Sequence, residues 1–230
     1  MHRFARMLGT LLVAAGVLAL AWVVVVWRWE DPFTALYTHV QQTRLSHAYE
    51  KRAAAFKPHL SGDLAAVERP VAREAADYRR TLRDGDPVER LKIRRMGLNI
   101  IVVQGTGRET LKKGPGHYGG SGLPGEGRLV YVGGHRTTYL APFAYIDDIR
   151  VDDVVRFELP YGAFTYRVTR HYVVGANDVS VLRNRGREVL RLQACHPRFF
   201  ASHRYIVDAK LVGVAPRGGT AYSPVRSASS

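Results

Sequence analysis

The sequence predicts an all-β domain, either a barrel or a sandwich, that follows one membrane-spanning helix and a further helical segment. Residues 8–27 form an apolar run without a charge, and residues 33–83 repeat apolar positions at helical spacing. From Val88 onward, short runs rich in β-branched residues alternate with Gly, Pro and Asp turns. Many short strands at regular spacing are typical of barrels and sandwiches. The chain therefore divides into an anchor, a helical linker and one β domain.

Composition agrees with a folded domain of ordinary size. The chain has 230 residues, 46% of them hydrophobic, which is enough for a packed core. Its single cysteine excludes an intrachain disulfide and a cysteine-rich zinc site. The net charge of +14 implies attraction to polyanions, which include nucleic acid, anionic lipid headgroups and anionic envelope polymers.

The apolar run from Leu8 to Trp27 predicts a transmembrane helix. At about 1.5 Å per residue it is long enough for the roughly 30 Å hydrocarbon core. A cleaved signal peptide is the alternative, with a possible cleavage site at residues 19–21, but the apolar run is longer than the usual signal-peptide core. Basic side chains in residues 1–7 predict a cytoplasmic N-terminus and place the rest of the chain outside the cell membrane. Nucleic acid is then excluded as a partner.

Residues 28–86 are predicted to form a helical stalk or linker. Apolar residues recur three and four positions apart at Phe33, Leu36, Tyr37, Val40, Leu45, Ala48, Tyr49, Ala53 and Phe56, and again at Leu64, Val67, Val71, Ala75, Tyr78 and Leu82. Pro70 indicates that the second helix restarts there, with proline in its first turn. The segment is expected to be either an extended stalk or a hairpin that packs on the domain. The turn at 83–87 marks the boundary.

The β domain is predicted to occupy residues 87–216. Strands are expected near 88–94, 98–104, 128–134, 153–159, 163–174, 188–194 and 204–214, and a helical turn at 142–149. Residues 217–230 are rich in Gly, Ser and Ala and are expected to be disordered.

Cys195 is the candidate nucleophile because it lies where one predicted strand ends, a loop follows and Arg204 enters the next strand. A buried, inert cysteine is the alternative. The thiolate is the reactive form, so the cysteine needs a base or a positive environment. His135 ends the predicted strand 128–134 and is the best candidate base, with His203 a further possibility. His196 adjoins the cysteine but points to the opposite face of an extended chain.

Other motifs carry weaker signals. The glycine-rich segment 114–122, which contains His117, lacks the Lys and Ser or Thr of a phosphate-binding loop and is read as turns. Cys195, His196 and His203 lack the spacing of zinc ligands, and the Asp147–Asp153 cluster is read as a solvated loop in preference to a calcium site. No cofactor and no metal ion is predicted.

Three motifs in order carry a family resemblance. The segments G-P-G-H-Y and R-L-V-Y-V-G-G-H-R-T-T-Y-L-A-P-F, then L-Q-A-C-H-P, then H-R-Y-I-V, resemble the sortases of Gram-positive bacteria. The H-R-T-T and A-P-F segments are most similar to class E sortases of actinobacteria. The resemblance covers roughly residues 88–215. It implies an eight-stranded sortase-type β-barrel. It also implies that His135 is the catalytic histidine, Cys195 the nucleophile and Arg204 the catalytic arginine. Sortases usually carry Thr before the cysteine, whereas here Ala194 stands there.

The resemblance implies a membrane-anchored cysteine transpeptidase. Such an enzyme cleaves a C-terminal sorting signal of the LAXTG or LPXTG type after Thr and passes the acyl group to an amine. The implied partners are surface proteins that carry the signal, and as acceptor the amine of the lipid II cell-wall precursor or a pilin lysine. The alternatives are a pilus-polymerising sortase and a membrane-tethered β-barrel binding module without activity.

Overall fold

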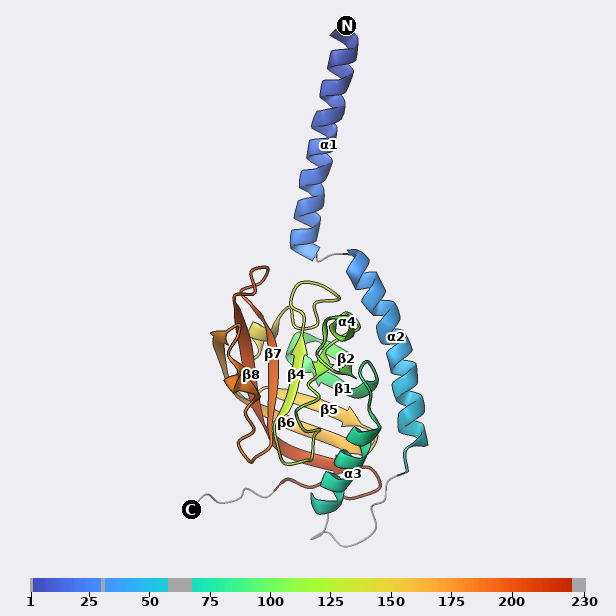
Figure 1. Ribbon diagram of the computed structural model, residues 1–230, viewed down its shortest axis with the longest axis vertical. Helices are drawn as coiled ribbons and strands as arrows, with labels where there is room; N and C mark the ends of the chain where they lie inside the picture. Colours follow the sequence, from blue (N-terminus) through green and yellow to red (C-terminus); the bar gives the residue numbers. More distant parts are fainter. Residues whose placement is uncertain (1, 30–31, 58–67, 225–230) are drawn as a thin grey trace.

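Eight strands close into one β-barrel, as the family resemblance implies (Figure 1). The computed structural model describes residues 2–29, 32–57 and 68–224. The strands are β1 (Pro87–Ile93), β2 (Leu98–Gln104), β3 (Gly116–His117), β4 (Val130–Gly134), β5 (Val154–Leu159), β6 (Gly162–Gly175), β7 (Val189–His196) and β8 (His203–Pro216). Their order around the barrel is β1-β2-β3-β4-β7-β8-β6-β5. Two neighbouring pairs, β2 with β3 and β4 with β7, are parallel, and the other neighbouring pairs of the barrel are antiparallel.

Alternation along β7 decides which residues face the barrel interior. Leu190, Leu192 and Ala194 are buried in the main core, so the residues between them lie on the outer face of the sheet. Cys195 belongs to this outer set and is half-buried. The nucleophile candidate is thus presented outside a closed and filled barrel.

The short strand β3 was not predicted from the sequence. It has two residues, which is too short for an alternating pattern, and it pairs with both β2 and β4. His117 lies in this strand and is buried, so the expectation of a turn residue there is wrong. Its ring nitrogens lie 3.2 Å from Glu89 Oε1 and 3.2 Å from Ser121 Oγ. These buried polar partners explain how a histidine is accommodated inside the domain.

Helix α1 (His2–Trp29) contains the predicted span. Residues Arg3–Val25 are long and apolar enough to cross a membrane, and none of this stretch is buried against the rest of the protein. In Figure 1 the helix projects away from the barrel. It is therefore a candidate membrane span, consistent with a membrane-anchored protein.

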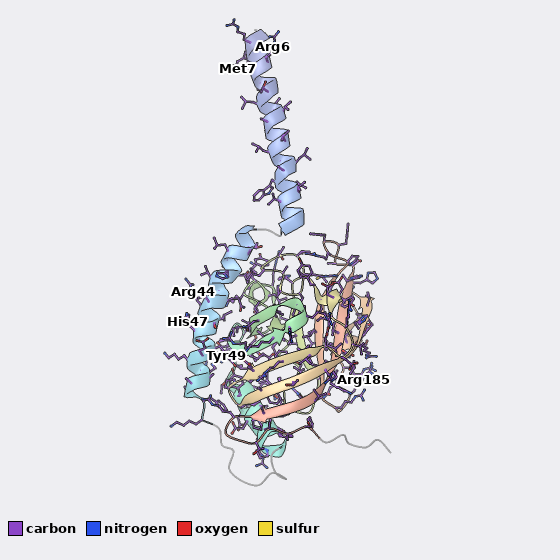
Figure 2. The ribbon with its side chains drawn as sticks, turned by 180° about the vertical axis from the view of Figure 1, so that it is seen from behind. Arg6, Met7, Arg44, His47, Tyr49 and Arg185 are labelled. Carbon is purple, nitrogen blue, oxygen red and sulfur yellow. The ribbon has the colours of Figure 1, made fainter. Side chains whose placement is uncertain are left out.

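The linker packs on the barrel as two helices and is not a free stalk. In α2 (Pro32–Ala55), Leu45 and Tyr49 pack with Ile101 and Val103 of β2. Figure 2 shows Tyr49 on the barrel side of α2 and the exposed Arg44 and His47 on the other side. In α3 (Glu68–Thr81), the predicted apolar stripe at Val71, Ala75 and Tyr78 is buried in the main core. The predicted residues Leu64 and Val67 lie outside the described residues.

The first half of the predicted stripe in α2 is wrong. Leu36, Tyr37 and Val40 are exposed, and polar residues hold this half of the helix instead. The buried Thr38 donates its hydroxyl to Lys112 O at 2.9 Å. Gln42 bonds both the N–H and the carbonyl of Ile101, at 2.8 and 2.9 Å, and also Lys113 O at 2.8 Å. The amide side chain therefore satisfies backbone groups as a neighbouring strand would.

The remaining segments are short. They are η2 (Arg94–Met96), α4 (Arg108–Leu111), η3 (Ile146–Asp148) and η4 (Val179–Leu182), of which η3 lies inside the predicted helical turn at 142–149. In the predicted tail, Tyr222 exchanges two backbone hydrogen bonds with Val214 of β8, at 2.8 Å each. Residues 225–230 lie outside the described residues.

Candidate functional site

The three predicted site residues meet at one end of the β4-β7-β8 sheet. Cys195 and Arg204 are direct partners in the antiparallel pair of β7 and β8. In the parallel pair of β4 and β7, Gly134 is opposite Ala194, so His135 follows β4 at the level of Cys195. Neighbouring strands lie about 4.8 Å apart, which places all three backbones within a short span.

Half-burial of His135 controls its protonation. Burial lowers the pKa of the imidazole below its ordinary value of 6.5, since a buried ring disfavours the charged form. The ring centroid lies 5.4 Å from that of Tyr139, which covers it on one side. Among the described residues no hydrogen bond joins His135 to Cys195, so any proton transfer between them needs an approach of the two side chains or of a bound substrate.

The loop after His135 folds back tightly over the site. Phe143 donates its N–H to His135 O at 3.0 Å. A Cβ at Gly134 would lie 2.6 Å from the ring of Phe143, so glycine permits this close approach. Tyr139, Leu140 and Ala141 have positive φ values of 54°, 61° and 36°, which side-chain-bearing residues rarely adopt.

Helix α2 helps to hold this strained loop. The N–H of Tyr139 donates to Thr34 Oγ1 at 3.2 Å, which joins the first turns of α2 to the loop that follows the histidine. Strained backbone persists only where surrounding contacts determine it. The helix that follows the candidate membrane span is therefore part of the support of the site.

Arg204 braces the β7–β8 loop. Its Nη1 donates to Ala201 O at 2.8 Å and to His203 O at 2.9 Å. A guanidinium has five N–H donors, so further donors remain for a ligand. The other arginine of this loop, Arg198, has its guanidinium over aromatic rings, 5.8 Å from Tyr145 and 5.7 Å from Phe199. The two arginines thus have different surroundings.

Arg136 was missed in the sequence, although it directly follows His135. It is buried, and it donates to Cys195 O at 3.4 Å and to Ala144 O at 3.3 Å. Its Nη1 lies 3.0 Å from His196 Nδ1, and its Nη2 pairs with Asp147. One side chain therefore connects the segment that carries the histidine with the segment that carries the cysteine. The available signal was the H-R pair at a strand end, where a buried arginine needs several acceptors.

The side chains of the other two candidate histidines, His196 and His203, contact residues other than the Cys195 side chain. His196 faces Arg136 and lies 5.8 Å from the ring of Tyr205, in agreement with its predicted position on the opposite face. His203 is exposed and its Nδ1 lies 2.9 Å from Ser202 Oγ. Within residues 2–29, 32–57 and 68–224 no group of three or more His, Cys, Asp or Glu side chains is arranged to hold a metal ion.

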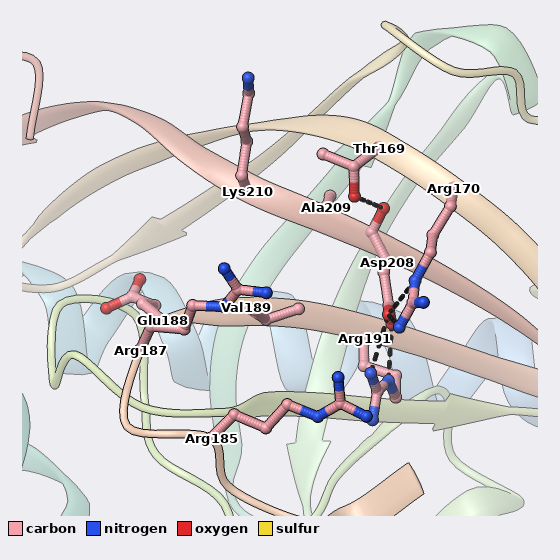
Figure 3. Close-up of a pocket in the computed structure, with 10 residues that line it drawn as sticks. All are labelled: Thr169, Arg170, Arg185, Arg187, Glu188, Val189, Arg191, Asp208, Ala209 and Lys210. Carbon is pink, nitrogen blue, oxygen red and sulfur yellow. Dashed lines mark hydrogen bonds and ion pairs between the residues drawn. The ribbon is translucent and has the colours of Figure 1, made fainter. Parts of the chain in front are cut away.

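An ion cluster around the buried Asp208 joins the strands that carry the site. Asp208 of β8 accepts bonds of 2.6 and 2.8 Å from Arg191 of β7 and of 3.0 and 2.8 Å from Arg170 of β6 (Figure 3). Arg191 also donates to Val181 O in the β6–β7 loop. These residues line a cavity of about 360 Å³ that also includes Arg185, Arg187 and Lys210. Charged residues from three strands thereby hold together the strands that carry Cys195 and Arg204.

Comparison with known proteins identifies relatives that are similar in sequence and in fold. A family model described as the sortase domain matches residues 91–212, which is more than half of the chain. Sortase D of Bacillus subtilis (strain 168) is 32% identical over 126 residues, which cover 53% of this chain and 62% of that protein. The chain thus spans less than two thirds of the length of this relative.

Solved structures agree. Sortase E from Streptomyces avermitilis is 35% identical with a TM-score of 0.53, over 58% of this chain and 93% of that one. A Clostridium perfringens sortase D5 transpeptidase has a TM-score of 0.61 over 75% of this chain and 99% of that one, and at 20% identity it shows the fold alone.

These relatives belong to two classes, D and E, at nearly equal identity. The similarity to class E that the H-R-T-T segment indicated is therefore not established at the level of the class. The matched family model, the sequence identity to sortase D and the barrel fold agree on the family. The chain belongs to the sortase family of transpeptidases.

Proposed function

We propose that this protein is a membrane-anchored sortase in which Cys195, His135 and Arg204 catalyse transpeptidation of a sorting signal. The observation that carries this proposal is the register that brings these three residues to one end of β4, β7 and β8 on the outer face of the barrel. The three residue types that suit a nucleophile, a proton donor and an anion binder occur together there.

The first half of the reaction forms a thioester. The Cys195 thiolate attacks the carbonyl carbon of the signal's threonine, and a carbon–sulfur bond forms. The carbon–nitrogen bond to the following glycine then breaks, and the leaving amine takes a proton from the His135 imidazolium. The guanidinium of Arg204 donates to the oxyanion of the tetrahedral intermediate.

The second half returns the enzyme to its starting state. An acceptor amine attacks the thioester carbonyl and passes its proton to His135. A new amide bond forms as the carbon–sulfur bond breaks, which regenerates the thiolate. The acceptor is an amine of the cell-wall precursor, and a pilin lysine is the alternative chemistry at the same thioester.

A lowered His135 pKa bears on this scheme. If the reactive form carries an imidazolium together with a thiolate, burial of the ring makes that form a minority near neutral pH.

The identity of the sorting signal is also part of the proposal. We propose an LAXTG-type signal, supported by the H-R-T-T and A-P-F segments and by the 35% identity to a sortase E. Ala194 leaves no hydroxyl before the cysteine, so substrate positioning there relies on other donors.

The proposal is tested by trapping the acyl-enzyme with a sorting-signal peptide in the absence of an amine. Mass spectrometry of the full chain should show one adduct, and Cys195→Ala should show none. If both an LAXTG and an LPXTG peptide form the adduct on Cys195, the rates of adduct formation decide which signal is preferred. If Cys195 reacts with thiol reagents but neither peptide forms an adduct, the proposed substrate class is wrong.

A pair of arginines makes the test of roles specific. Arg204→Ala should lower kcat on a soluble peptide by roughly 10²–10³, as loss of an oxyanion donor does. Arg204→Lys should restore little of it, because an ammonium lacks the planar fork. Arg198→Ala is the matched control from the same loop and should have a small effect. A crippled Arg198→Ala with a nearly normal Arg204→Ala would refute the assignment.

A further inference from the structure

The loop beside the candidate nucleophile carries unusually exposed aromatic residues. Phe199 is 55% exposed and Phe200 is 81% exposed, and both lie between Cys195 and Arg204. Tyr145 is 56% exposed, and the Arg198 guanidinium lies within 6 Å of the rings of Tyr145 and Phe199. We call these four residues, Tyr145, Arg198, Phe199 and Phe200, the aromatic tip. Exposed apolar residues that gather at one place mark a contact surface.

Chain continuity places this end of the barrel near the membrane. The candidate span ends at Val25, α1 ends at Trp29 and α2 begins at Pro32. Two connecting residues reach at most about 11 Å, and the last four residues of α1 add about 6 Å. Thr34, in the first turn of α2, bonds Tyr139 in the loop that follows His135. With the first turn of α2 and the Thr34–Tyr139 bond added, the loop that follows His135 lies within roughly 30 Å of the hydrocarbon boundary, whatever the angle of α1.

The tip lies at this same end. Cys195 and the β7–β8 loop are at the carboxyl end of β7, level with His135 at the carboxyl end of the parallel strand β4. Figure 1 shows the β7–β8 loop and the start of α2 at the end of the barrel from which α1 projects. The opposite end of the barrel holds α3 and the start of β7.

The composition of the tip suits a lipid interface. Aromatic rings prefer the headgroup region, and an arginine can place its guanidinium at lipid phosphates while its stem lies against apolar groups. Among the described residues, Arg198 forms no ion pair with a carboxylate, and its Nε is buried without a hydrogen-bond partner. The net charge of +14 adds attraction to an anionic surface.

We propose that the aromatic tip inserts into the headgroup region of the leaflet from which α2 emerges, and that this second contact holds Cys195 at the membrane surface. The partner is a lipid bilayer with anionic headgroups. The inference rests on the proposed anchoring by α1 and does not depend on the proposed chemistry at Cys195. A second contact with the bilayer, beside the span, would fix the orientation of the barrel relative to the membrane surface.

The experiment uses the full chain reconstituted in vesicles of phosphatidylcholine and phosphatidylglycerol. Cys195→Ala removes the natural thiol, and Phe200→Cys then carries a single environment-sensitive fluorophore. Asn184→Cys, an exposed position before the start of β7, is the matched control. We expect the label at 200 to shift to shorter wavelength, to be quenched by nitroxide lipids at a depth of about 5–10 Å, and to be shielded from iodide. The label at 184 should stay open to iodide.

Two results would overturn the proposal. Equal iodide quenching at 200 and 184 would show that the tip stays in water. A label at 200 that ignores the bilayer but responds to a sorting-signal peptide in detergent would make the tip a substrate contact. Flotation of the vesicles separates the failure modes, because a chain that does not float with them has lost the anchor itself. Acyl-enzyme formation in the unlabelled protein reports on the proposed chemistry independently.

Discussion

Arg136 joins the two chain segments on which the proposed chemistry depends. It bonds the carbonyl of Cys195 and the ring of His196, while its neighbour His135 ends the other segment. These contacts do not reach the Cys195 sulfur or the His135 ring, so we regard Arg136 as a positioning residue. Its removal also lowers stability, because the carbonyls of Cys195 and Ala144 lose their donor, at a cost of about 1–3 kcal/mol.

We predict that Arg136→Ala lowers kcat by about 10–100-fold, with little change in KM, because the relative position of histidine and cysteine changes. Kinetics should be measured below the unfolding temperature of the variant, where circular dichroism shows a folded protein. Arg183→Ala removes an exposed arginine and serves as the control. A variant that loses stability but keeps kcat would show that the role of Arg136 is structural only.

His135 should titrate below pH 6.5, because burial disfavours its charged form. With a folded pKa below the unfolded one, stability is lost as pH falls from 6.5 through the folded value. NMR of histidine-labelled protein, assigned with His135→Gln, measures the midpoint. Tyr139→Ala uncovers the ring and should raise the midpoint toward 6.5, whereas Tyr145→Ala should not. A midpoint above 6.5 in the folded protein would contradict this account.

At the scale of elements, α2 is attached to the barrel by a side chain that acts as a strand would. Gln42 bonds the N–H and carbonyl of Ile101 and the carbonyl of Lys113. The apolar contact of α2 is confined to its second half, at Leu45 and Tyr49. The position of the first half, and with it the support of Tyr139 by Thr34, therefore depends on polar contacts.

Gln42→Ala should lower the free energy of unfolding by about 1–3 kcal/mol, because backbone groups of β2 and of the segment before β3 lose their partner. Gln41→Ala changes the same residue type one position earlier in the helix and should have a smaller effect. Urea denaturation of both variants, in the same detergent, gives the comparison. Equal midpoints for the two variants would remove Gln42 from this role.

At the scale of the whole molecule, a single cysteine reports the orientation of the chain. Basic residues precede the span, and the predicted topology places the barrel outside. A membrane-impermeant maleimide should therefore label Cys195 in intact cells, and Cys195→Ala cells should give no signal from this protein. Labelling that requires permeabilised cells would reverse the topology.

Several features of this protein are local in the sequence and could be predicted from it. The uncharged run at 8–27 predicts α1, because the length of such a helix must match a membrane. Alternation around Leu190, Leu192 and Ala194 predicts both a strand and its buried face. The order of His135, Cys195 and Arg204 within the sortase-like motifs selects the candidate site before any geometry is known.

The tertiary structure alone decided the features that depend on distant partners. β3 exists because β2 and β4 offer it hydrogen bonds, and two residues carry no pattern of their own. In the first half of α2, Leu36 and Val40 are exposed, whereas Thr38 and Gln42 contact the domain. The helix therefore turns the opposite face to the domain from the one that apolar spacing predicts. The role of Arg136 arises only when Cys195 and Asp147 surround it. Periodicity records which face of one element is buried, whereas these contacts are set by the register between elements, which no single segment encodes.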